Sequence, residues 1–277
     1  MFEILLSLAA AICWALNGIV YKKGVKGVSV FTANFHRTLF ATLYFLPFAV
    51  VEMRNTTIDL QTAIILVISA ILSFYIGDLS YFAALKRSPV SIALPASSTY
   101  PVYVVLLSTI LYGIELRINT LLSALLVFVA VYIIYGKKDE KIVRSGLVFA
   151  LLAAVSWSLA ILTLDFLTAR LSMPVIAFTR MLLCLILLSF TVKRVEVQNR
   201  DSVLYAGILG GFLSFTGIAI FITAIGVSSS WNVVQPSAAS PVFSAVLGAI
   251  ILKERIDRRV ITGIGIIALS ISLLLLQ

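Results

Sequence analysis

Ten apolar runs, each about as long as a bilayer is thick, dominate this chain. A helix rises 1.5 Å per residue, so roughly 20 apolar residues are needed to cross the hydrocarbon core. The runs are continuous rather than alternating, which favours helices over the strands of a β-barrel. We therefore predict an all-α integral membrane protein with ten transmembrane helices, at approximately residues 3–21, 31–51, 60–84, 89–112, 118–136, 145–165, 174–192, 202–225, 231–252 and 259–276.

The composition excludes several other classes of protein. The 277 residues are 61 % hydrophobic and only 12 % charged, and the mean hydropathy is +1.11, whereas about a quarter of the residues of a soluble domain are charged. A soluble enzyme, a disordered chain and a disulfide-stapled secreted scaffold are all excluded. Cys13 and Cys184 lie inside apolar runs and are interpreted as small hydrophobic residues. The first run lacks a basic flank and a cleavage site, so we expect a retained helix rather than a signal peptide.

The sequence also lacks the motifs of cofactor and metal chemistry. We find no nucleotide-binding loop, no cluster of His, Cys and carboxylate residues, and no nucleophile beside a base. We therefore expect no cofactor, no metal and no enzymatic activity.

Lysine and arginine are distributed unevenly between the connecting loops. Sixteen of them fall in the odd-numbered loops and three in the even-numbered loops. By the positive-inside rule the odd loops face the cytoplasm and both termini face outward. The net charge of +9 is thereby assigned to cytoplasmic loops, and nucleic acid is not an expected partner.

The two halves of the chain repeat each other. The offset between matched residues drifts only from 143 to 139 along the half-chain, which chance explains poorly. The matched pairs are Trp14 and Trp157, Arg37 and Arg180, Leu72–Phe74 and Leu213–Phe215, Pro95 and Pro236, Pro101 and Pro241, and Glu115 and Glu254.

Five spans per half make the repeat an inverted one. An odd number of spans forces the second half to enter the membrane from the opposite side, so a pseudo-twofold axis lies in the membrane plane. We predict two five-helix repeats, residues 1–140 and 141–277. This architecture is typical of secondary transporters, because two exchangeable halves allow two states that open to opposite sides.

These features resemble the EamA type of the drug/metabolite transporter superfamily. The resemblance rests on the 5+5 repeat, the early tryptophan of each half, and the fourth-span patterns "ALPASSTYPVYVVLLSTILYGIELR" and "VVQPSAASPVFSAVLGAIILKERI". It implies a central cavity lined by the first, third and fourth spans of each half, with the fifth spans peripheral. It also implies export of small metabolites, often amino acids, and cytoplasmic termini, which is the reverse of the orientation that the loop charges predict.

Four charged residues inside the spans are candidates for gating or coupling. A charge in a membrane interior is costly and needs a reason. From their depth we expect Arg37 to pair with Asp78 near one face, and Arg180 with Asp165 near the other. Each pair would form a gate that is closed in one of the two end states. The alternative is a static ion pair, or an arginine that reaches the headgroups. Asp78 is the better candidate for proton coupling, with His36, the single histidine, as the other.

Four prolines lie inside the fourth and ninth spans, where each frees a backbone carbonyl. Such groups are tolerated in a membrane only when they are buried in protein or line a wet cavity. We therefore expect these helices to bend at Pro95, Pro101, Pro236 and Pro241, beside a polar cavity at the repeat interface. The alternative is that the small residues there only allow close packing. The candidate cavity residues are Trp14, Asn17, Tyr75, Tyr81, Ser98, Thr99, Tyr103, Trp157, Asn232, Gln235 and Ser237.

We interpret the sequence as a secondary transporter that moves a small polar or amphipathic metabolite, such as an amino acid, across the cell membrane by alternating access. The alternatives are an exporter of lipid-linked intermediates or drugs, and a channel or sensor that binds a ligand without turnover. The expected partners are the substrate, the lipid bilayer and, if transport is coupled, protons. The protein would be a monomer or a homodimer.

Overall fold

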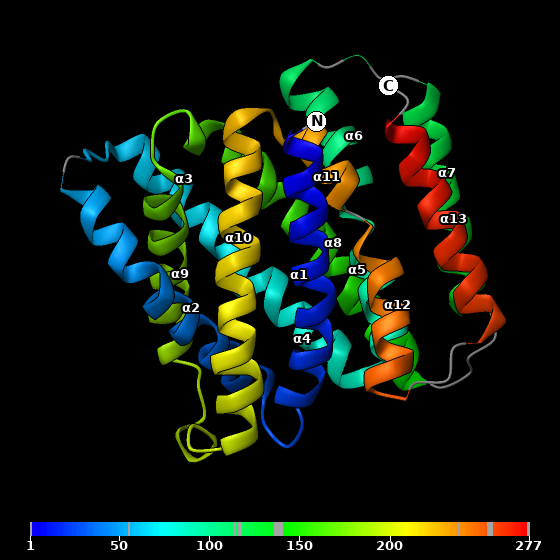
Figure 1. Cartoon of the computed structure of the whole chain (residues 1–277), viewed down its shortest axis with the longest axis horizontal. Coiled ribbons are helices and arrows are strands. Elements are labelled where there is room, and N and C mark those ends of the chain that lie inside the picture. Colours follow the sequence, from blue (N-terminus) through cyan, green and yellow to red (C-terminus); the bar gives the residue numbers. More distant parts are fainter. Residues whose placement is uncertain are drawn as a thin grey trace.

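The computed structural model describes residues 2–54, 56–113, 115, 118–135, 141–237, 239–253 and 257–275, and every element within them is helical (Figure 1). The elements of the first half are α1 (Phe2–Gly24), α2 (Val30–Met53), α3 (Leu60–Ala70), η1 (Ile71–Gly77), α4 (Asp78–Arg87), α5 (Val90–Ser97), α6 (Tyr100–Tyr112) and α7 (Ile118–Tyr135). Those of the second half are α8 (Lys141–Thr168), α9 (Met173–Ser189), η2 (Arg194–Glu196), η3 (Ser202–Leu209), α10 (Gly210–Val227), α11 (Ser230–Ser237), α12 (Ser240–Ile251) and α13 (Arg258–Leu275).

Several helices are suited to a membrane. Large hydrophobic side chains are exposed on the outer surface, as lipid contact requires; Leu60, Ile110 and Phe190 are each more than three-quarters exposed. α2 carries the buried polar residues Asn34 and Arg37, which lower its mean hydropathy, and the apolar α9 has only 17 residues. Six helices in the described residues are long and apolar enough to cross a bilayer: Phe2–Gly24, Leu60–Arg87, Val90–Tyr112, Arg144–Thr168, Ser202–Val227 and Ser230–Ile251.

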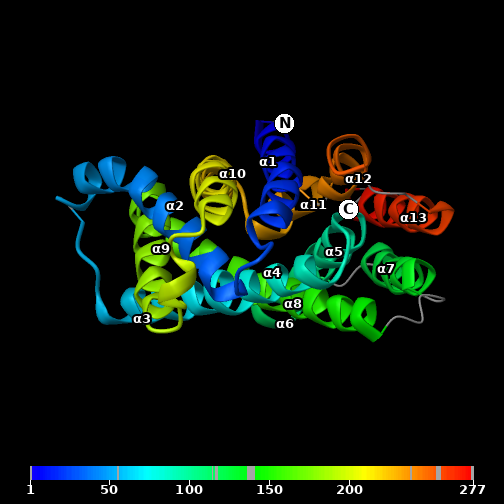
Figure 2. The ribbon, with the colours of Figure 1, turned by 90° about the horizontal axis from the view of Figure 1, so that it is seen from below.

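The helices of the two halves interleave. α1 packs along η3 and α10, and α8 packs in the same manner along η1 and α4. α2 packs against α9 at one edge of the bundle, and α7 packs against α13 at the opposite edge (Figures 1 and 2). The start of α1 and the end of α13 lie at the same end of the bundle (Figure 1).

The loop after α9 caps a helix of the other half. The carboxylate of Glu196 accepts hydrogen bonds from the backbone N–H of Ser29 and the hydroxyl of Thr32, both at 2.7 Å. These groups form the first turn of α2, whose amides attract an anion. Partial desolvation acts to raise the pKa of Glu196, but these hydrogen bonds outweigh it and lower that pKa to about 2. Nearby, His36 is fixed between the hydroxyl of Ser202 and a backbone carbonyl, both at 2.9 Å.

The fourth and ninth predicted spans are broken rather than bent. α5 ends at Ser97 and α6 begins at Tyr100, while α11 ends at Ser237 and α12 begins at Ser240. Pro95 and Pro236 lie inside the short helices α5 and α11, and Pro101 and Pro241 each lie in the first turn after the break. A proline in the first turn costs no hydrogen bond, because that N–H has no partner within the helix. Pro101 and Pro241 therefore begin new helices, where the sequence predicted kinks.

Candidate functional site

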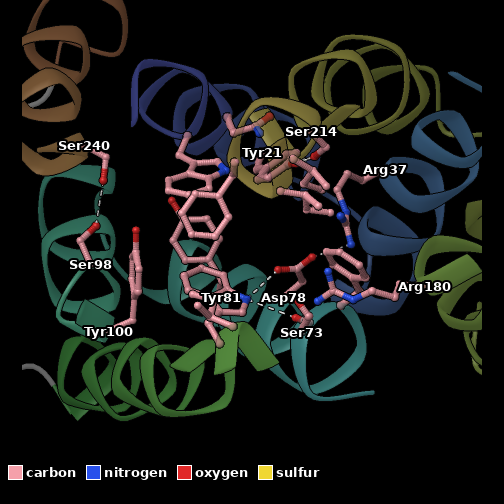
Figure 3. Close-up of a pocket in the computed structure, with 18 of the residues that line it drawn as sticks. Tyr21, Arg37, Ser73, Asp78, Tyr81, Ser98, Tyr100, Arg180, Ser214 and Ser240 are labelled. Carbon is pink, nitrogen blue, oxygen red and sulfur yellow. Dashed lines mark hydrogen bonds and ion pairs between the residues drawn. The ribbon is translucent and has the colours of Figure 1, made fainter. Parts of the chain in front are cut away.

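A cavity of about 130 Å³ lies where the helices of the two halves meet (Figure 3). Both broken helices reach it, through Ser98 and Tyr100 on one side and Ser240 on the other. The full lining is Trp14, Asn17, Tyr21, Arg37, Ser73, Phe74, Asp78, Tyr81, Leu94, Ser98, Tyr100, Trp157, Ile161, Leu164, Arg180, Ser214, Ile218, Phe221, Ile222 and Ser240.

An ion pair forms one wall of the cavity. Arg37 Nη2 lies 2.5 Å from Asp78 Oδ2, and the Arg37 side chain is 1 to 2 % exposed. The Arg37 guanidinium also donates to the amide oxygen of Asn34, at 3.1 Å from Nε and 2.9 Å from Nη2. The other carboxylate oxygen of Asp78 accepts from the indole N–H of Trp157 at 3.0 Å. Asp78 is thus engaged on both oxygens, as a buried charge requires.

A π-helical segment, η1, positions Asp78 at the start of α4. The wider turn leaves carbonyl groups without their usual partners, and such segments often accompany functional sites. Side chains from two neighbouring helices supply the missing donors. These donor–acceptor pairs are Ser156 Oγ to Leu72 O at 2.6 Å, Trp157 Nε1 to Ser73 O at 3.2 Å, and Asn34 Nδ2 to Phe74 O at 2.8 Å.

Gly77 allows Trp157 to reach Asp78. A Cβ atom at position 77 would lie 2.5 Å from the indole of Trp157 and 2.9 Å from the carbonyl oxygen of Leu72. Both distances are far shorter than van der Waals contact, and the indole is held by hydrogen bonds. The approach of Trp157 therefore requires a glycine at this position.

We expect Gly77→Ala to lower the midpoint of thermal unfolding in detergent by several degrees, since overpacking costs about 1–3 kcal/mol. It should also change the intrinsic fluorescence, because the indole of Trp157 must move. Gly265→Ala is the matched control, since a Cβ there meets nothing within 4 Å. Equal midpoints for the two variants would contradict this account of Gly77.

Arg180 enters the cavity from α9 without an ion-pair partner. It is 2 % exposed, its Nε is buried without a hydrogen bond, and the residues described give it no carboxylate within 4.0 Å. Its guanidinium carbon lies 4.7 Å from the ring centroid of Phe74, and that of Arg37 lies 5.3 Å from the same centroid. Two buried cations therefore flank one aromatic ring, and only one of them has a carboxylate of its own.

Aromatic rings form the facing wall. The ring centroids of Trp14 and Phe221 lie 4.9 Å apart, and those of Tyr81 and Trp157 lie 5.3 Å apart. Tyr100 lies edge-on to both tryptophans, with centroid distances of 6.3 and 6.4 Å. The cavity thus combines apolar stacking surface with a few convergent polar groups, as binding sites for small molecules do.

Hydroxyl groups join the two halves around the cavity. Ser98 and Ser240, beside the two helix breaks, lie 3.1 Å apart between hydroxyl oxygens. Tyr100 bonds to Ser237 at 2.5 Å between hydroxyl oxygens, and the hydroxyl of Tyr21 bonds to that of Ser214. These contacts connect elements more than 130 residues apart in the sequence.

The structure places some of the predicted site residues around this cavity. Arg37 and Asp78 form the expected ion pair. Trp14 and Trp157, the early tryptophans of the two repeats, lie on the same wall with Tyr100 between them. The predicted residues that line the cavity are Trp14, Asn17, Tyr81, Ser98, Trp157, Arg37, Asp78 and Arg180.

Other predicted residues do not line the cavity. Arg180 and Asp165, the pair expected to close the other gate, do not form an ion pair in this structure, where Asp165 accepts a hydrogen bond from the backbone N–H of Ser230 at 2.8 Å. Asn232 is exposed. Gln235 donates to a backbone carbonyl of its own helix, and Thr99, in the break before α6, donates to the carbonyl of Ala96 in α5. Ser237 reaches the site only through Tyr100, while Tyr75 and Tyr103 pack against the hydrophobic core.

Several lining residues were not predicted as cavity residues. Ser73 and Ser214 are the central residues of the repeated "LSF" motif, so the repeat itself marked them. Tyr100 and Ser240 were not singled out as candidates, but they belong to the polar stretches around the prolines that the sequence predicted to line the cavity. Tyr21 carries no such signal, because it lies close to the polar end of its span.

The described part of the chain contains no group of three or more His, Cys, Asp or Glu residues that could hold a metal ion. Among the described residues that line the cavity, the one carboxylate is that of Asp78, which is paired with Arg37.

Comparisons with known proteins identify what this chain is similar to. The model of the EamA-like transporter family matches residues 1–136 and 144–276. An "Uncharacterized transporter" of Archaeoglobus fulgidus is 68 % identical over 276 residues, covering 100 % of this chain and 99 % of that protein. A solved crystal structure of a protein superposes on this chain with a TM-score of 0.67 at 17 % sequence identity. The superposition covers 99 % of this chain and 96 % of the solved chain. The two proteins therefore share a fold.

Proposed function

We propose that this chain, which belongs to the EamA-like transporter family, is a secondary transporter that moves a small organic metabolite across the cell membrane by alternating access. Its family and its apolar helices make it a multi-pass membrane transporter. The substrate class, the mechanism and the ten-span topology form the proposal. We also propose export as the direction, because the sequence resemblance implies it.

The packing supports two inverted five-helix repeats. The contact of α1 with η3 and α10 matches the contact of α8 with η1 and α4, which is the exchange that a twofold axis produces. The pairs α2 with α9, α5 with α12, and α7 with α13 match in the same way. The family model matches the chain in two stretches of similar length. Ten spans also agree with α1 beginning and α13 ending at the same end of the bundle (Figure 1).

The observation that carries the proposal is the cavity between the two broken helices. Discontinuous helices at the interface of two repeats are where transporters of this architecture bind substrate. A cavity of about 130 Å³ is similar in size to an engineered cavity of about 150 Å³ that holds benzene. This volume favours a solute no larger than a small amino acid, and disfavours a lipid-linked intermediate.

Counterflow in proteoliposomes tests the proposal. Vesicles are preloaded with one unlabelled compound, drawn from a panel of amino acids and small organic acids, and diluted into its labelled form. A transporter accumulates the label transiently above equilibrium, because internal substrate occupies the returning sites. A channel or a sensor shows no such overshoot. The absence of an overshoot for every compound of the panel would contradict the proposed function.

Tryptophan fluorescence locates the site independently of turnover. Trp14 lines the cavity, while Trp231 lies outside it and packs against Tyr112 at a centroid distance of 5.8 Å. A saturable fluorescence change with a transported compound should be reduced in Trp14→Phe and retained in the matched control Trp231→Phe. The reverse result would place the substrate elsewhere.

A further inference from the structure

We propose that the cavity selects a substrate with a net negative charge, a small carboxylate without an ammonium group, and that Arg180 binds the carboxylate. This inference rests on the proposed function, because it names the substrate class of the same cavity. It follows from the charges of the lining and from the difference between the two arginines.

The lining carries one more cation than anion. Its ionised side chains are Arg37, Arg180 and Asp78, and arginine keeps its charge under all ordinary conditions. The tyrosines and serines of the lining are neutral near pH 7. The formal charge of the described lining residues is therefore +1. A charge enclosed in a protein is stable only when it is paired, so the bound ligand is expected to supply one negative charge.

Arg37 and Arg180 differ in their hydrogen-bond and ion-pair partners. Every nitrogen of Arg37 faces a partner: Asn34, Asp78 or the sulfur of Met181 at 3.8 Å. Arg180 has no such partner among the residues described, and its Nε is buried without a hydrogen bond. Figure 3 shows Arg180 extending toward the cavity beside Asp78. A guanidinium presents a planar fork that fits a carboxylate with two parallel hydrogen bonds. Arg180 is therefore the group that is available to a ligand.

The described lining offers an ammonium group no free carboxylate: the amide oxygen of Asn17 is buried there without a hydrogen bond, but it is neutral and can satisfy only part of a group with three donors. An amine would need a carboxylate or several free acceptors, and Asp78 is already bonded to Arg37 and to the indole of Trp157. To bind a zwitterion the cavity would have to break that ion pair. We therefore infer that a carboxylate binds better than the amino acid with the same carbon skeleton, and that its apolar body lies against Trp14 and Tyr100.

The test uses four probes with similar skeletons and different charges: isovalerate (−1), isovaleramide (neutral), L-valine (zwitterion) and 3-methylbutylamine (+1). Each is titrated into the purified protein while tryptophan fluorescence is recorded. We expect isovalerate to bind about tenfold or more tightly than each of the others, the range for a charge-assisted bidentate contact. Tighter binding of isovaleramide, valine or the amine would overturn the proposal, and so would an absence of binding by isovalerate.

Substitutions of Arg180 assign the contact. Arg180→Gln should abolish the preference for isovalerate over isovaleramide, and Arg180→Lys should restore part of it. Arg170→Gln is the matched control, because Arg170 is an exposed arginine outside the cavity that also lies over a phenylalanine ring. An unchanged preference in Arg180→Gln would overturn the assignment. Circular dichroism and the elution volume confirm that each variant folds.

A small inorganic anion is an alternative ligand for Arg180, so the titrations are repeated in a carboxylate-free HEPES buffer without chloride and in the same buffer with added sodium chloride. Equal isovalerate affinity in the two buffers supports an organic carboxylate. A saturable response to chloride that prevents isovalerate binding would assign the site to an inorganic anion and overturn the substrate class. The counterflow assay is independent of these results: an overshoot with a neutral or zwitterionic compound would contradict this inference and leave the transporter function intact.

Discussion

Asp78→Asn should lower the midpoint of thermal unfolding in detergent by about 10 °C. Asp78 is the one carboxylate in the lining of a cavity that holds two buried arginines. Its removal leaves both guanidinium groups without an opposite charge, and breaking one partner of a buried pair costs about 3–5 kcal/mol. For a protein of this size, 1 kcal/mol corresponds to about 2–4 °C. The asparagine side chain is nearly isosteric, so the effect reports charge rather than packing.

The controls for this prediction separate charge from position. Asp201→Asn removes a carboxylate from an exposed residue and should change the midpoint by less than about 2 °C. The double variant Arg37→Gln, Asp78→Asn removes both charges of the pair and should be more stable than Asp78→Asn alone. A double variant that is no more stable than the single one would show that the ion pair does not account for the loss.

The sequence predicted the all-helical membrane fold, because helix formation depends on patterns along the chain. Apolar runs of bilayer length predicted where helices form, and the drifting offset matched Trp14 with Trp157. Depth in the span was sufficient to pair Arg37 with Asp78. The same reasoning paired Arg180 with Asp165 in the other end state, and in this structure the two side chains project to different places, because depth does not give the face from which a side chain projects. Arg180 points to the cavity, while Asp165 accepts from the backbone N–H of Ser230.

The two broken helices show a second limit of prediction from sequence. The polar residues around the prolines were predicted to line the cavity in both halves, yet Ser98 does so while Asn232 is exposed. Polar residues around the prolines of the two halves thus took different environments, since the orientation of a short helix is set by its neighbours. The π-helical segment before Asp78 could not be predicted from the local sequence either, because side chains of helices distant in the sequence satisfy its carbonyl groups.

A disulfide between the two broken helices should stop transport. In a background without Cys13 and Cys184, oxidation of Ser98→Cys, Ser240→Cys should abolish counterflow, and reduction should restore it. The two hydroxyl oxygens are 3.1 Å apart, close enough for cysteine sulfurs to bond with small adjustments. Alternating access requires the two halves to move against each other around the site, and this bond would join them beside the cavity. The measurement is the counterflow overshoot before and after reduction.

The matched control joins two halves at a place where no relative motion is required by the proposal. Ser123 and Ser270 lie 2.6 Å apart between hydroxyl oxygens, where α7 packs against α13 at the edge of the bundle. Ser123→Cys, Ser270→Cys should therefore form its disulfide and keep most of its counterflow, because the cavity lining contains no residue of either helix. Mass spectrometry verifies that each bond has formed. Full counterflow with the bond between positions 98 and 240 in place would contradict alternating access around this cavity, whereas loss in both variants would mean that α7 and α13 also move in each transport cycle.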